Sequence, residues 1–184
     1  MRLFIGFDLP FQVASDIKAF TDPLRTAVRI QWSRAENLHV TIKFIGEWPE
    51  ARLGPLREAL SSLLPRTAIP ITARGLGFYP NHKSPQSFWA GIEAPPALDR
   101  LARDTNQVLA PLGIEPEARA YSPHLTLARI RSKVPLGPLK REIGRTPPHS
   151  FGSFTAGSFC LYLSKPGAAG SVYTKLSEFP LEST

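Results

Sequence analysis

Short apolar stretches closed by turn residues recur along the whole chain and predict a protein rich in β-strands. The stretch 2–8 is apolar and is followed by Leu9-Pro10, as expected of a buried strand. The same kind of pattern predicts seven further strands, at residues 29–33, 38–45, 69–78, 87–92, 124–130, 154–163 and 172–179. We expect the last two to form a hairpin across residues 166–170.

Between these stretches the apolar residues follow helical spacing. Pro10 suits a first helical turn, and Pro23 is expected to end that helix near residue 20 or 21. Regularly spaced leucines predict a second helix over 50–64, and a third runs from about 98 to 109 after Pro95-Pro96. Residues 131–150 are rich in proline, lysine and arginine and are expected to be irregular. Paired strands beside helices favour an α+β fold with antiparallel sheets.

Composition and charge narrow the class of protein. The 184 residues are 42% hydrophobic and 20% charged, which suits one globular domain over residues 1–184. The net charge of +7 favours an anionic partner, with nucleic acid first and a membrane surface second. Cys160 is the single cysteine and is expected to be a small buried residue. No apolar run approaches the ~18 residues of a membrane span, so we expect a cytoplasmic protein.

One short pattern occurs twice: His39-Val40-Thr41-Ile42 and His124-Leu125-Thr126-Leu127. Alternate side chains of a strand share a face, so the histidine and threonine of each copy point the same way. The residues between them, together with Phe44 in the first copy, are expected to anchor each strand in a core. Two related lobes that face each other across a cleft would bring both copies together.

Two imidazoles and two hydroxyls are suited to phosphate ester chemistry. A neutral histidine accepts a proton from an attacking water, and a protonated one donates to the leaving oxygen. The threonine hydroxyls can stabilise the charge that grows on the other phosphate oxygens. A single His-x-Thr in a strand is usually structural, but two matched copies favour catalysis. Zinc would need three or four ligands, and neither copy has a second ligand residue at suitable spacing, so we expect no metal.

At these residues the chain resembles the 2H phosphoesterase superfamily and, within it, the bacterial RNA 2′,3′-cyclic phosphodiesterases, also called 2′-5′ RNA ligases. The resemblance covers nearly the whole chain and is carried by five stretches: 2–10, 36–46, 88–91, 122–129 and 172–176. It implies a bilobal, pseudo-symmetric α+β fold with two antiparallel sheets, flanked by helices, around a central cleft. One departure is Leu161-Tyr162-Leu163-Ser164, where many relatives have a Glu-Ser pair.

The resemblance also implies a reaction, the opening of a terminal 2′,3′-cyclic phosphate to a 2′-phosphate without a cofactor. By the usual family assignment His39 is the proton donor and His124 the proton acceptor, while Thr41, Thr126 and Arg129 bind the phosphate. The expected partner is RNA with a cyclic phosphate end, and the expected state is a monomer.

Several neighbouring residues allow two interpretations. Simple alternation places Arg129 on the face opposite His124, so a phosphate contact requires a bulge or a position at the strand end, and a solvent-facing charge is the other interpretation. Lys43 either adds positive potential to the site or is an ordinary exposed lysine. Four aromatic residues are suited to stacking on a base, although core packing is favoured for each: Trp32, Phe78, Tyr79 and Tyr121. His82 and His149 lie in loops and are expected to be non-catalytic.

Two other functions remain open at this point. A module that holds RNA ends or nucleotides without turnover is the main alternative, although both motif histidines are present. A nucleotide-dependent ligase would need a Lys-x-Asp-Gly motif, and 43–46 lacks the aspartate. Ligation by reversal, with a 5′-hydroxyl attacking the cyclic phosphate, would use the same site.

Overall fold

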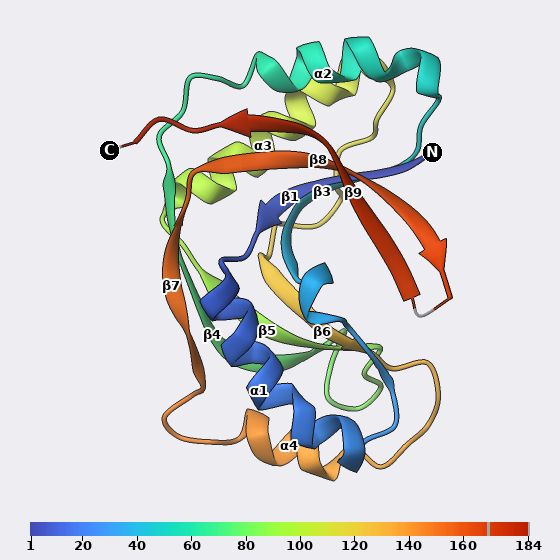
Figure 1. The fold of residues 1–184 in the computed structure, drawn as a ribbon, viewed down its shortest axis with the longest axis vertical. Helices are drawn as coiled ribbons and strands as arrows, with labels where there is room; N and C mark the ends of the chain where they lie inside the picture. Colours follow the sequence, from blue (N-terminus) through green and yellow to red (C-terminus); the bar gives the residue numbers. More distant parts are fainter. Residues whose placement is uncertain (169, 184) are drawn as a thin grey trace.

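The computed structural model describes residues 1–168 and 170–183 and contains two antiparallel sheets with helices packed on them (Figure 1). The four-stranded sheet has the order β3-β1-β8-β9, formed by β1 (Arg2–Asp8), β3 (His39–Glu47), β8 (Ser158–Gly167) and β9 (Gly170–Pro180). The five-stranded sheet has the order β2-β6-β5-β4-β7, formed by β2 (Gln31–Trp32), β4 (Ile69–Tyr79), β5 (Ser87–Glu93), β6 (His124–Arg129) and β7 (Ser150–Ala156). Part of the predicted final turn, Ala169, lies outside the described residues.

Four α-helices complete the fold: α1 (Phe11–Ala27), α2 (Leu53–Ser61), α3 (Pro96–Leu109) and α4 (Gly137–Ile143). Single-turn 3₁₀ segments occur at Ala35–Asn37, Glu50–Arg52 and Ala110–Leu112. Helices α2 and α3 lie over the four-stranded sheet, whereas α1 and α4 lie beside the five-stranded sheet (Figure 1). The predicted α+β class with antiparallel pairing is therefore confirmed.

A continuous apolar core connects the two sheets. It includes three fully buried phenylalanines, Phe7 on β1, Phe88 on β5 and Phe159 on β8. Burying a side chain of this size contributes about 1.5–3 kcal/mol, so these rings fix both sheets to one interior. The predicted burial of Cys160 is also confirmed.

Three sequence predictions about the elements are wrong. Helix α1 does not end before Pro23 but continues to Ala27, because Leu24 on its last turns packs in the core and outweighs the lost backbone bond. Residues 131–150 contain α4, which begins with Pro138 in its first turn and buries Leu139. The apolar stretch 154–163 is divided at Gly157 between two strands of different sheets.

Two further elements are shorter than predicted. The strand expected over 29–33 is reduced to Gln31–Trp32, and the helix expected over 50–64 begins as a 3₁₀ turn and ends at Ser61. In the part of the chain that the structure describes, no helix is long and apolar enough to cross a membrane.

Candidate active site

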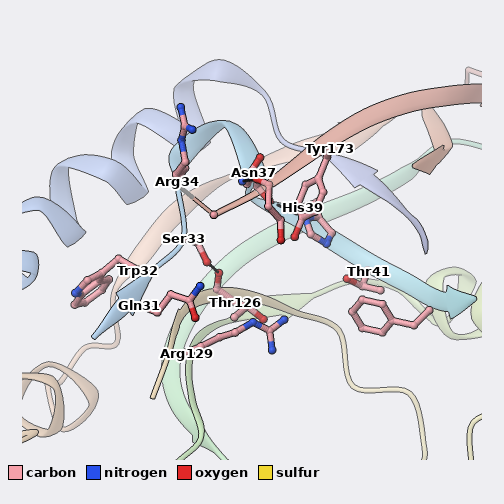
Figure 2. A pocket seen from close by; sticks show the side chains of 13 residues that line it. Gln31, Trp32, Ser33, Arg34, Asn37, His39, Thr41, Thr126, Arg129 and Tyr173 are labelled. Carbon is pink, nitrogen blue, oxygen red and sulfur yellow. Dashed lines mark hydrogen bonds between the residues drawn. The ribbon is translucent and has the colours of Figure 1, made fainter. Parts of the chain in front are cut away.

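The first His-x-Thr copy lies on β3, at the edge of the four-stranded sheet, and the second on β6 in the five-stranded sheet. Val40 and Leu125 are fully buried, which fixes each strand and leaves the histidine and threonine of each copy on the other face. Figure 2 shows His39 and Thr41 facing Thr126 and Arg129 across a pocket. The sheets thus bring together residues that are far apart in sequence.

A β-bulge interrupts both strands at the same place in the motif. In the pairing of β1 with β3, Gly6 lies opposite Thr41 and Ile5 opposite Lys43, so Ile42 is the extra residue. In the pairing of β5 with β6, the register skips Leu127 in the same way. A bulge shifts the alternation of side chains by one, so the residues that follow change face.

The bulge corrects the expectations for three residues. Phe44 is 54% exposed rather than part of the core, and it lines the pocket. Arg129 occupies the corresponding position of the second copy and lines the same pocket. The bulge thus turns Arg129 to the face from which it can reach a phosphate. Lys43 is buried, and its Nζ donates to the carbonyl of Glu115 at 2.7 Å and to Glu117 Oε1 at 3.3 Å. Lys43 is therefore not an ordinary exposed lysine.

The pocket has a volume of about 280 Å³ and is well suited to an anion. Four of the five predicted site residues line it: His39, Thr41, Thr126 and Arg129. The remaining lining residues are Gln31, Trp32, Ser33, Arg34, Asn37, Phe44, Gly170, Ser171 and Tyr173. None of the described lining residues is an aspartate or glutamate. Arg34 is paired with Glu36, so the positive potential of the pocket comes mainly from Arg129.

His39 is held by a backbone carbonyl and by aromatic rings. Its Nδ1 lies 2.7 Å from the carbonyl oxygen of Asn37, which fixes the proton on Nδ1 and leaves Nε2 to exchange a proton with a ligand. The ring lies 4.5 Å from that of Phe4 and 5.2 Å from that of Tyr173. These contacts set the imidazole in one orientation toward the pocket.

Burial lowers the pKa of His39 below its ordinary value of 6.5. The hydrogen bond to Asn37 and the charge of Asp8 oppose this shift, whereas the positive charges of Arg129 and His124 add to it. His39 is therefore mainly neutral near pH 7 in the free protein. An anion in the pocket acts in the opposite direction and favours the protonated form.

His124 is exposed, and its Nδ1 faces a backbone carbonyl in the same way as that of His39. Its Nδ1 lies 2.8 Å from the carbonyl oxygen of Ser122, two residues earlier, as Asn37 is for His39. His124 lines a groove next to the pocket, and the two cavities share Thr41 and Phe44. His39 therefore lines the pocket and His124 the adjoining groove.

Core packing holds for three of the four aromatic residues, since Phe78 is buried and both Trp32 and Tyr121 are partly buried against the core. Tyr79 is 44% exposed, Trp32 lines the pocket, and Tyr121 lines the groove and donates its hydroxyl to the carbonyl of Thr41 at 2.8 Å. Phe78 is buried as expected, although its edge reaches the groove.

The two remaining histidines lie elsewhere. His149 bonds to Glu142 of α4 at 2.7 Å, and His82 packs against the ring of Phe78. Neither is among the described residues that line the pocket or the groove. Across residues 1–168 and 170–183, no cluster of three or more His, Cys, Asp or Glu side chains is placed to hold a metal ion.

Sequence reasoning missed several residues that form the site. Asn37 and Ser122 act through their carbonyls, which any residue type provides, so no motif marks them. Tyr173 comes from β9, and only the pairing of β8 with β9 brings it beside His39. Trp89 lies opposite Thr126 on β5, with its ring 6.4 Å from that of His124. The sequence marks the stretches around Tyr173 and Trp89 only through the family resemblance.

Comparison with known proteins gives consistent results. A model of the family described as LigT like Phosphoesterase matches the chain twice, over residues 8–89 and 92–173, and each match contains one His-x-Thr copy. Two similar curated proteins come from Thermus thermophilus (33% identity over 190 residues, 98% of this chain and 90% of the relative) and Methanocaldococcus jannaschii (30% over 179 residues, 97% and 100%). Both are named RNA 2′,3′-cyclic phosphodiesterase.

Solved structures share the fold over the full length. The crystal structure of TT0787 of Thermus thermophilus has a TM-score of 0.82 and 29% identity, with 98% of this chain and 97% of that chain covered. Escherichia coli LigT in its apo form has a TM-score of 0.79 and 26% identity, with 98% and 96% covered. The pseudo-symmetric fold expected from the sequence is thereby confirmed.

Proposed function

Because this chain belongs to the LigT like phosphoesterase family, we propose that it opens the 2′,3′-cyclic phosphate at an RNA end to a 2′-phosphate. The relatives named RNA 2′,3′-cyclic phosphodiesterase align with almost the whole chain, so the proposal does not depend on one segment. Crystal structures of the similar Escherichia coli LigT hold 3′-AMP and phosphate. The observation that carries the proposal is that two His-x-Thr copies from different sheets come together. His39, Thr41 and Thr126 line one anion pocket, and His124 lines the adjoining groove.

In this reaction His124 Nε2 accepts a proton from water as the water oxygen attacks phosphorus. The bond from phosphorus to the 3′ oxygen breaks, and His39 Nε2 donates a proton to that oxygen. Both nitrogens are available because both Nδ1 atoms face backbone carbonyls. After one turnover His39 is neutral and His124 protonated, and exchange with solvent restores the starting forms.

The phosphate would be held by Thr41, Thr126 and Arg129. The two hydroxyls donate to non-bridging oxygens, and the Arg129 guanidinium neutralises the charge that develops on them. Thr126 is also fixed through its backbone, because Ser33 Oγ donates to its carbonyl at 2.6 Å (Figure 2). A rigid set of donors loses little energy to reorganisation as the transition state forms.

The same groups also serve ligation, in which a hydroxyl takes the place of water. A 5′-hydroxyl in place of water would attack phosphorus, give its proton to His124 and displace the 3′ oxygen, which takes the proton of His39. The product is a 2′-5′ linkage, and one phosphate ester replaces another without an energy source. We therefore include 2′-5′ ligation in the proposed function.

The experiment that tests the proposal is incubation of the protein with a short RNA ending in a 2′,3′-cyclic phosphate, in excess EDTA. We expect complete conversion to a 2′-phosphate, identified by mass and by its resistance to a 3′-specific phosphatase. A 3′-phosphate would reverse the assigned leaving group. Loss of activity in EDTA that added metal restores would reject the metal-independent mechanism. No product at all would favour a module that binds RNA ends or nucleotides without turnover.

The pH dependence of the rate tests the role of His39. If His39 takes part in proton transfer, kcat/KM has one limb below pH 6.5, where His39 titrates in the free protein. Bound phosphate raises that pKa, so the limb that His39 contributes to kcat lies at higher pH than the one it contributes to kcat/KM. Steady-state rates of the wild type and of His39→Ala from about pH 4.5 to 9 measure these limbs. The limb below pH 6.5 should disappear in His39→Ala, and its persistence would assign it to another group.

A further inference from the structure

A second large cavity lies beside the anion pocket, on the His124 side. This groove has a volume of about 870 Å³ and shares Thr41 and Phe44 with the pocket. The anion pocket and the groove therefore meet where the two His-x-Thr copies meet. Hydrolysis of a terminal cyclic phosphate requires one nucleoside and one water, and a second space of this size is more than a water requires.

The floor of the groove is an indole that lies flat on the five-stranded sheet. Trp89 is opposite Thr126 on one side and opposite Gly77 on the other, so its ring is on the sheet face that carries the motif. A Cβ atom at Gly77 would overlap the Trp89 ring, which shows that the ring lies directly over the glycine. The absence of a side chain at Gly77 thus creates a flat aromatic surface next to His124.

A second aromatic residue continues this surface. Tyr79 is two residues after Gly77 on β4 and therefore on the same face, and its ring is 44% exposed. The Arg119 guanidinium lies 5.6 Å from the centre of the Tyr79 ring. Exposed rings accompanied by an arginine form the usual stacking surface for single-stranded nucleic acid.

The groove contains cations as well as carboxylates. Asp99, Arg103 and Arg119 line it. Glu117 also lines it and is paired with Lys43. The arginines suit the groove to the phosphates of an RNA strand. At its His124 end a nucleophile would have to give up a proton, so the nucleotide placed there must have a free 5′-hydroxyl.

We propose that this groove binds the 5′-hydroxyl nucleotide of a second RNA strand, with its base against Trp89 and Tyr79. The inference rests on the proposed function and specifies its ligation direction. In-line displacement places the attacking and leaving oxygens on opposite sides of phosphorus. The 5′ oxygen enters from the groove and gives its proton to His124, and the 3′ oxygen leaves on the His39 side, where it takes a proton.

Binding of an RNA without a cyclic phosphate tests the groove by itself. The probe is a dye-labelled, single-stranded tetranucleotide with a 5′-hydroxyl and an ordinary 3′ end, titrated by fluorescence anisotropy. We expect Tyr79→Ala and Arg119→Ala each to weaken binding by roughly 5- to 100-fold, the range found for loss of one stacking group. Phe11→Ala, which removes an 85% exposed ring on α1, is the matched control and leaves binding unchanged.

Kinetics with a cyclic mononucleotide separate the two cavities. A nucleoside 2′,3′-cyclic phosphate has no second nucleotide, so Tyr79→Ala keeps its KM and kcat within about twofold while the tetranucleotide affinity falls. A parallel rise in KM would show that the groove holds the nucleoside of the cyclic phosphate itself, and equal tetranucleotide binding by wild type and Tyr79→Ala would show no role for the groove. Either result overturns the proposal. Failure of the wild type to open the cyclic phosphate would instead reject the proposed function.

Discussion

Alanine at His39 or at His124 is expected to lower kcat for cyclic phosphate opening by about 10²- to 10⁴-fold, the range for loss of a general acid or base. Each variant removes the Nε2 that exchanges a proton and leaves the phosphate pocket otherwise complete. The double variant should be little slower than either single one, because the two groups act together in a single displacement.

Folding should survive both changes, since His124 is exposed and His39 is only partly buried. Thermal unfolding followed by circular dichroism checks this, and kcat is measured with the RNA used for the wild type. His82→Ala is the control, because this histidine lines neither the pocket nor the groove and should keep full activity. Wild-type turnover by the His39→Ala protein would reject the two-histidine mechanism.

Arg129→Ala is expected to reduce kcat/KM by about 10- to 100-fold. Loss of one preorganised donor in an enclosed site costs about 10²- to 10³-fold, and the exposure of Arg129 to solvent reduces this. Arg129→Lys restores part of the loss because the charge remains while the planar pair of donors does not.

The matched control is Arg131→Ala, which removes an exposed arginine just after the same strand. Its kcat/KM should stay within about twofold of the wild-type value when both are measured at the same ionic strength. Equal losses in the two variants would mean that Arg129 contributes only to the overall positive charge, and the phosphate contact would be rejected.

The residues that carry the chemistry could be predicted because strand alternation is a local property. His39 and Thr41 precede the bulge, so the period of two places them correctly. Beyond Ile42 the same rule fails for Lys43 and Phe44, because the extra residue is set by pairing with β1 and leaves no mark in the local pattern.

Errors in the elements have the same origin in long-range packing. Pro23 ends a helix in isolation, yet burial of Leu24 stabilises the turns that follow it. The division of 154–163 at Gly157 follows from the neighbours that each part meets, with β4 beside β7 and β1 beside β8. An uninterrupted apolar stretch does not contain this information. The positions of Tyr173 and Trp89 in the site could not be predicted for the same reason, since strand pairing places each ring beside a motif histidine.

The strand order has a consequence for how such a duplicated chain can be divided. The two segments that match the family model each supply strands to both sheets: β3 and β8 lie in one sheet, while β4 and β6 lie in the other. Neither segment retains a complete sheet without the other. The boundary between the repeats is therefore not a boundary between folding units, and a fragment ending near residue 90 would expose the edges of two incomplete sheets. A fragment that contains only one of the two histidines is therefore not expected to fold, so both histidines must be in the same folded chain.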